Sequence, residues 1–158
     1  MSRDPVSATA GTLQVPSSGF LEVLATFYEA FAEHDAGRRG ELLARCLTPD
    51  AVIWGHSRVF AGYAAISEKI AGFHSNWSDC RLVLASGLFA FDNIVRSGVA
   101  IVRSDGSVLA RGESVTEFAC DGRICRVVPL WEMTLPPLPD GWPGHLAVPP
   151  SPKAPNAA

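Results

Sequence analysis

The stretch from residue 94 to residue 132 constrains the fold more than any other part of the chain. It contains three runs rich in apolar and β-branched residues, which are separated by the pairs Asp105-Gly106 and Asp121-Gly122. An Asp-Gly pair between two such runs predicts a β-hairpin, because glycine tolerates the positive φ that a type I′ turn requires. Two consecutive hairpins predict an antiparallel meander, and such a sheet needs a second layer to bury one of its faces.

Helices are expected upstream of this meander. Apolar residues recur at helical spacing in three segments: Phe20–His34, Glu41–Leu47 and Tyr63–Trp77. A short strand is expected at Ala51–Trp54, and a longer one at Arg81–Phe91, where Gly87 favours a β-bulge. Because the segments show no regular βαβ alternation, the order predicts an α+β domain with a curled antiparallel or mixed sheet.

The length of 158 residues suits one domain. We expect a flexible arm at residues 1–19, the α+β domain at 20–133, and a tail at 134–158 that holds most of the twelve prolines. The first 19 residues lack a basic start followed by an apolar run, and no stretch approaches the roughly 20 apolar residues of a membrane span. A soluble, cytoplasmic protein is therefore expected.

Charge and cysteine spacing argue against several kinds of partner. The net charge is −3 and only two lysines occur, so we expect no nucleic-acid partner. The four cysteines contain no CxxC pair, and we expect them to be reduced, buried thiols. The four histidines form no i, i+4 pair, so neither a metal nor another cofactor is expected.

One short segment carries a resemblance to a known family. The residues Phe60-Ala61-Gly62-Tyr63-Ala64-Ala65-Ile66 follow the strand around Ala51–Trp54 and resemble the F/W-x-G-x-x-A-I segment of SnoaL-like members of the nuclear transport factor 2-like superfamily. The closing hairpin at Asp121-Gly122 is also similar. The resemblance covers about residues 20–132 and implies a sheet curled around the helices into a cystatin-like cone. It further implies an apolar pocket at the open end and a homodimer.

Strand alternation predicts which residues would face such a pocket. If the second hairpin turns at its Asp-Gly pair alone, Phe118 pairs with Cys125 and one face carries Ser114, Thr116, Phe118, Val127, Pro129 and Trp131. The other face carries Val115, Val128 and Leu130 with the charge pairs Glu117–Arg126 and Arg111–Glu132. We expect the uncharged face to line the pocket and the charged face to be solvated or to form the dimer interface. A bulge that changed this register would turn Glu113 and Glu117 inward.

The family's best-known catalytic acids are not retained on this register. The position that resembles the acidic oxyanion donor of ketosteroid isomerase is about Thr116, and the position that resembles its base is Gly55, followed by His56. The Asp-Arg-Asp set of limonene epoxide hydrolase falls on Gly98, Arg96 and Pro129, so only the arginine is kept. Neither reaction is supported as the family performs it.

Histidine and tyrosine are the remaining candidates for proton transfer. A neutral imidazole, with a reference pKa near 6.5, can accept and return a proton at about neutral pH. We therefore expect His56 as base and Tyr28 or Tyr63 as donor to an oxyanion, a set similar in type to that of scytalone dehydratase. Candidate substrate-binding residues are Trp54, Phe73, His74, Trp77, Arg96, Thr116, Phe118 and Trp131.

Structural roles compete with each of these assignments. The aromatic residues suit the core, His56 suits a loop, His74 suits a core edge, and Arg96 suits an ion pair with Glu113 or Asp92. Two functions stay open at this point. One is a cofactor-independent lyase or isomerase acting on an apolar cyclic or polyketide-like substrate, and the other is a non-catalytic ligand-binding or dimerisation module.

Overall fold

The computed structural model describes residues 18–132 together with residues 140 and 143. The expected arm and tail therefore lie largely outside the described residues. The elements follow the chain in this order: α1 (Ser18–Ala32), α2 (Ala36–Cys46), β1 (Leu47–Trp54), β2 (Val59–Ala61), α3 (Gly62–Asn76), β3 (Cys80–Phe91), β4 (Ile94–Arg103), β5 (Val108–Phe118) and β6 (Ile124–Trp131).

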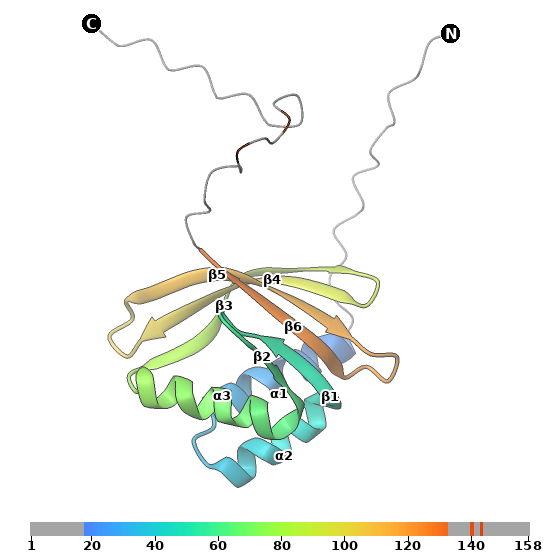
Figure 1. The fold of residues 1–158 in the computed structure, drawn as a ribbon, viewed down its shortest axis with the longest axis horizontal. Coiled ribbons are helices and arrows are strands. Elements are labelled where there is room, and N and C mark those ends of the chain that lie inside the picture. Colours follow the sequence, from blue (N-terminus) through green and yellow to red (C-terminus); the bar gives the residue numbers. More distant parts are fainter. Residues whose placement is uncertain (1–17, 133–139, 141–142, 144–158) are drawn as a thin grey trace, which may run out of the picture.

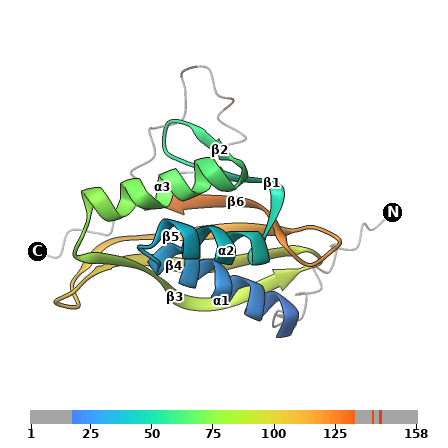
Figure 2. The ribbon, with the colours of Figure 1, turned by 90° about the horizontal axis from the view of Figure 1, so that it is seen from below.

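The three helices cover one face of a single curled sheet (Figure 1). Figure 2, seen from the helix side, shows α1, α2 and α3 lying across the strands. The strand order is β2-β1-β6-β5-β4-β3; β1 and β6 run parallel and every other neighbouring pair is antiparallel. The expected α+β architecture with a mixed sheet is confirmed.

Both Asp-Gly hairpins are present, but their loops are longer than a type I′ turn. In the first, the amide of Arg103 donates to the carbonyl of Ser107 at 2.8 Å, and Gly106 has a φ of 86°. The side chain of Asp105 accepts a hydrogen bond from the Ser107 amide at 2.8 Å. This pattern is a three-residue loop with glycine in the left-handed position, so the expected turn type was wrong.

The second hairpin has the same loop geometry, and this loop shifts the residue pairing of β5 with β6 next to the turn. The Ala119 amide donates to the Arg123 carbonyl at 2.8 Å, and Gly122 has a φ of 83°. The extra loop residue places Phe118 opposite Ile124, not opposite the following cysteine as expected. Beyond this irregularity the predicted register is confirmed, and the predicted facing pairs align: Ser114 with Pro129, Thr116 with Val127, and Glu117 with Arg126.

The predicted helices are confirmed with shifted ends. The second helix begins earlier than expected, because Asp35 caps it by accepting a hydrogen bond from the Arg38 amide at 2.8 Å. The short strand β2 was not predicted.

The bulge expected at Gly87 is confirmed, since the pairing of β3 with β4 shifts between Leu84 and Leu88. None of the helices in the described ranges is long and apolar enough to cross a membrane.

The core lies between the helices and the inner face of the sheet. Leu24 and Phe27 of α1, Ile66 and Ile70 of α3, and Val95 of β4 are among its most buried side chains. Each contributes roughly 1.5–3 kcal/mol through burial. The cysteines are free, as expected, but only Cys46 is fully buried, and Cys120 is exposed because it lies in the second hairpin loop.

Candidate functional site

Three hydroxyl groups lie on the helix-facing side of the sheet. Ser97 of β4 pairs directly with Ser114 of β5, and Thr116 lies one inward-facing position further along β5. Only 2%, 6% and 2% of these three residues, respectively, is exposed. We call Ser97, Ser114 and Thr116 the hydroxyl row. Their inward neighbours on the same strands, Val95 and Phe118, are apolar, so the row is a polar strip within an apolar face.

Tyr28 of α1 brings a fourth hydroxyl to this row. Its side chain is half-buried and packs against the core, and Ser97 lies close enough to its hydroxyl to influence the pKa of the phenol. Burial raises the pKa of Tyr28 to about 12, and the hydrogen bond with Ser97 acts in the opposite direction. The phenol is therefore neutral at neutral pH and can donate a hydrogen bond, but it is a poor source of phenolate base.

His56 lies in a different part of the fold. It is exposed in the loop between β1 and β2, which is closed by a hydrogen bond of 2.8 Å from the Gly55 amide to the Arg58 carbonyl. Trp54, just before this loop, is 49% exposed. Within the described residues, no hydrogen bond or ring contact joins His56 to Tyr28, so the predicted pair is not brought together by direct contact.

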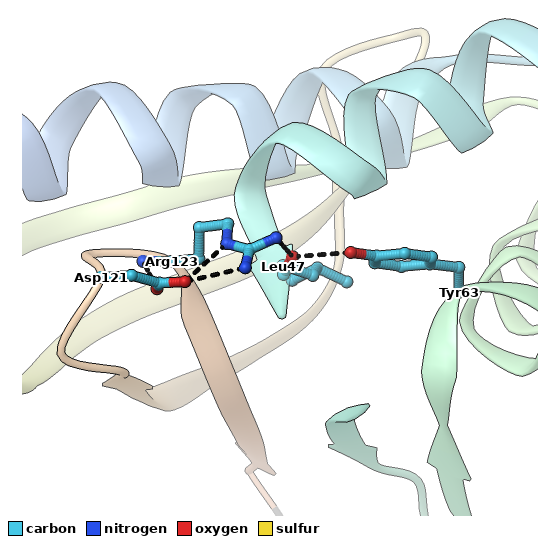
Figure 3. Close-up of polar contacts among 4 residues, drawn as sticks. All are labelled: Leu47, Tyr63, Asp121 and Arg123. Atoms are coloured by element: carbon cyan, nitrogen blue, oxygen red, sulfur yellow. Dashed lines mark hydrogen bonds and ion pairs between the residues drawn. The ribbon is translucent and has the colours of Figure 1, made fainter. Parts of the chain in front are cut away.

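Tyr63 is held by the backbone of β1. Its hydroxyl donates to the carbonyl of Leu47 at 3.1 Å, and the same oxygen accepts a bond of 3.3 Å from Arg123 (Figure 3). Arg123 is in turn fixed by Asp121 through two contacts of 2.9 and 2.8 Å. The pairing of β1 with β6 is irregular just after Leu47, which makes this carbonyl available to side chains. The geometry gives Tyr63 a structural role; its catalytic role stays a prediction.

The aromatic candidates of α3 gather at the C-terminal ends of the helices. Phe73 lies edge-on to Phe31 at a ring-centroid distance of 5.8 Å and to Trp77 at 5.5 Å. His74 stacks on His34 at 4.1 Å, and its Nε2 lies 2.8 Å from the Phe31 carbonyl. Since a carbonyl only accepts, this Nε2 carries the hydrogen. These rings form one cluster, in which Trp77 is 44% exposed.

Arg96 projects from the opposite face of the sheet. It is exposed and forms a two-contact ion pair with Glu113, with Nε 2.9 Å from Oε2. The hydrogen bonds from Arg96 lower the pKa of the Glu113 carboxyl. The ion pair with Glu113 is therefore the role that Arg96 has in the structure. Its other predicted role, as an anchor for a ligand in an inner pocket, does not fit a side chain on the outer face. Glu113 and Glu117 both point outward, and Glu117 pairs with Arg126 at 3.1 Å.

Phe118 and Trp131 occupy different environments. Phe118 is 1% exposed and stacks on Phe20 of α1 at 4.2 Å, which makes it a core residue. Trp131 is half-buried at the end of β6, opposite Gly112. A Cβ at Gly112 would lie 2.5 Å from the Leu130 carbonyl oxygen, so this close approach of β5 and β6 requires glycine. A ligand-binding role stays a prediction for both aromatic residues.

Arg39 is a buried charged residue that the sequence did not single out. It is 3% exposed, and its Nε donates to the Ser67 hydroxyl at 2.9 Å. Its Nη1 donates to the carbonyls of Glu33 and His34 at 2.9 and 3.2 Å. These carbonyls follow the end of α1, where backbone acceptors lack helical partners. Arg39 therefore ties the end of α1 to α3.

Two surface hollows lie outside the hydroxyl row. One, of about 670 Å³, lies between α1 and α2 and is lined mainly by charged residues such as Glu29, Arg38 and Glu41. The other, of about 390 Å³, lies beside the β3 bulge and is lined in part by Ser86 and Arg111. Within the described ranges, no three His, Cys, Asp or Glu side chains converge as a metal site would require.

Comparison with known proteins identifies the family. A family model for the SnoaL-like domain matches residues 24–127. A search of curated proteins finds no match. Among solved structures, a proposed isomerase of the SnoaL-like family from Agrobacterium tumefaciens superposes with a TM-score of 0.67 at 23% identity, covering 73% of this chain and 98% of that one.

Two further structures support the same fold. A proposed SnoaL-like polyketide cyclase from Jannaschia has a TM-score of 0.60 at 13% identity and covers 75% of this chain and 91% of its own. A protein of unknown function with a cystatin-like fold from Methylobium petroleophilum has a TM-score of 0.60 at 18% identity, with 89% and 98% covered. Identities this low carry the fold alone, but the family model spans most of the domain. The chain belongs to the SnoaL-like family.

Proposed function

We propose that this SnoaL-like protein binds a small, largely apolar molecule at the hydroxyl row and acts on it as an isomerase or cyclase. The observation that carries the proposal is the hydroxyl row, three buried hydroxyls on the helix-facing side of the sheet, with Tyr28 of α1 next to Ser97. The similarity to proposed isomerases and polyketide cyclases supports a cyclic or polyketide-like substrate.

In the proposed reaction, Tyr28 donates a hydrogen bond to a substrate oxygen on which negative charge develops. A donor aimed at such an oxygen in a site of low polarity stabilises the transition state more than the ground state. The row offers hydroxyls and no carboxylate, so proton abstraction requires another residue. His56 is the proposed base; its exposed imidazole lies in the β1–β2 loop, away from the row, so in this mechanism the substrate extends from the row to that loop.

Hydrogen–deuterium exchange at carbon tests this proposal. Enolisable cyclic ketones would be incubated with the protein in D₂O, and exchange beside the carbonyl would be followed by NMR. We expect Tyr28→Phe to slow catalysed exchange about 10²- to 10³-fold, the typical loss for one oxyanion donor. Tyr63→Phe is the matched control, because it removes a phenol hydroxyl that is bonded to the backbone.

The role of His56 has its own readout. His56→Ala should slow catalysed exchange about 10²-fold or more, because it removes the proposed base. An unchanged rate in a folded His56→Ala variant would remove His56 from the mechanism.

A non-catalytic binding domain is the second candidate. It is favoured by the absence of any carboxylate on the helix-facing side of the paired segments 95–101, 112–118 and 127–131. This candidate predicts that a ligand binds, that Tyr28→Phe weakens the binding, and that no carbon-bound proton exchanges.

We also propose a homodimer formed through the outer face of the sheet. Several apolar side chains on this face are exposed, among them Phe91 at 71% and Leu130 at 53%. The charges between them are matched in pairs, Arg96 with Glu113 and Glu117 with Arg126. Such a face suits burial against a second copy. Light scattering of Leu130→Glu compared with wild type tests this, and a monomeric wild type would contradict it.

A further inference from the structure

Two cations converge on one aromatic ring at the β2 edge of the sheet. The guanidinium carbon of Arg58 lies 4.3 Å from the centroid of the Phe60 ring, and the Lys69 ammonium nitrogen lies 5.1 Å from it. Phe60 belongs to β2, the edge strand, whereas Lys69 projects from α3. Both distances fall within the range of cation–π contact.

The position of the ring is constrained by the loop before it. A Cβ at Gly55 would lie 2.8 Å from Phe60 Cε2 and 2.9 Å from the Arg58 carbonyl oxygen, so ring and loop pack closely on this glycine. The hydrogen bond between the Gly55 amide and the Arg58 carbonyl holds the loop in place. The two cations are therefore positioned by packing on the ring and by a closed loop.

Neither cation has an anionic partner within the described part of the chain. The ion pairs found there use Arg38, Arg96, Arg103, Arg123 and Arg126. Glu68, although next to Lys69 in the sequence, forms no ion pair with it. Two neighbouring positive charges thus stand together in a protein whose net charge is −3.

Lys69 is also partly withdrawn from water. Burial lowers the pKa of the Lys69 ammonium, and the nearby positive charge of Arg58 lowers it further. Charged groups that lose water are usually compensated by an opposite charge, and the ring compensates only in part. An oxyanion would compensate both cations, because a guanidinium binds such a group through paired N–H donors and an ammonium binds it as a point charge.

We propose that Arg58 and Lys69 form a binding site for a small oxyanion, the phosphate or carboxylate group of a ligand. The site lies at the β2 edge, apart from the hydroxyl row on β4 and β5, and it does not depend on the proposed reaction.

Lysine acylation with and without inorganic phosphate tests the site. The chain has two lysines, Lys69 and Lys153, so peptide mapping after a brief acetic anhydride pulse reports each separately, with the second as an internal reference. Ionic strength is held constant with chloride. Phosphate at about ten times its dissociation constant should slow acylation of Lys69 about tenfold, by mass action, and leave Lys153 unchanged. Acetate in place of phosphate distinguishes a carboxylate site from a phosphate site.

Variants of Arg58 test whether the protection of Lys69 from acylation depends on this arginine. Arg58→Met should abolish protection of Lys69, and Arg58→Lys should retain part of it. Arg81→Met removes an exposed arginine from β3 and should leave the protection unchanged. Equal slowing at both lysines, no slowing at Lys69 with either anion, or full protection in a folded Arg58→Met protein would each overturn the proposal.

Discussion

The Tyr63 hydroxyl donates a hydrogen bond to the carbonyl oxygen of Leu47 at 3.1 Å (Figure 3). This bond joins the first turn of α3 to the start of β1, at the point where β1 leaves its regular pairing with β6. The same oxygen accepts a bond from Arg123, so the second hairpin is tied to the same place. One carbonyl thus connects α3, β1 and the second hairpin.

Tyr63→Phe should lower the free energy of unfolding by about 1 kcal/mol, because it removes one hydrogen bond to a part-buried carbonyl. The second bond from Arg123 leaves this oxygen partly satisfied, which limits the loss. Urea denaturation measures the change. Loss of ligand binding in a stably folded Tyr63→Phe protein would instead support the catalytic role predicted for this residue.

Arg39→Met should lower the free energy of unfolding by roughly 2–4 kcal/mol. It removes a buried guanidinium and leaves the Ser67 hydroxyl and the Glu33 and His34 carbonyls without this donor. Arg38→Met is the matched control. The side chain of Arg38 is 75% exposed and pairs with Glu33, so its replacement should change stability by less than about 1 kcal/mol. Similar unfolding free energies for the two variants would contradict the assigned role of Arg39.

The raised pKa of Tyr28 predicts a loss of stability at high pH. The phenol titrates near 10 in the unfolded chain and at about 12 in the folded one, so the folded state binds more protons between these values. The stabilisation of the folded state that comes from this pKa difference is complete below pH 10. It falls by up to about 2–3 kcal/mol as the pH rises to 12. Denaturation at several alkaline pH values should show this component in wild type but not in Tyr28→Phe.

Glycine substitutions should separate close packing from chain flexibility. Gly112→Ala should cost more than about 2 kcal/mol, because its Cβ would meet the Leu130 carbonyl oxygen at 2.5 Å. Gly72→Ala lies within α3 with no atom within 4 Å of the new Cβ, and it should stabilise by about 0.5–1 kcal/mol. Thermal unfolding of both variants checks the opposite signs, and a neutral Gly112→Ala would show that β5 and β6 can separate without cost.

The architecture could be predicted because its main signals are local. Apolar spacing defines α1 and α3, and the Asp-Gly pairs define both hairpins and most of the β5–β6 register. The loop type could not be predicted, since Asp-Gly fits a two-residue turn and also the last two positions of a three-residue loop. β2 was missed because Val59–Ala61 is too short to show a period.

The site was less predictable than the fold because it depends on contacts between distant segments. Arg38 and Arg39 are adjacent and chemically identical, yet one is exposed and the other buried, and only the packing of α2 against α3 distinguishes them. The outward direction of Arg96 follows from the pairing of Val95 with Thr116, which no local pattern specifies. Ser97 has no sequence signal at all, because its burial arises from the packing of the helices on the inner face of the sheet.

The most direct test of the central claim is native mass spectrometry of the protein purified from its own host, comparing wild type with Tyr28→Phe and Tyr63→Phe. The account predicts that wild type and Tyr63→Phe retain the same small neutral molecule and that Tyr28→Phe loses it. Equal retention by Tyr28→Phe would contradict the claim that the Tyr28 hydroxyl and its row form the binding site.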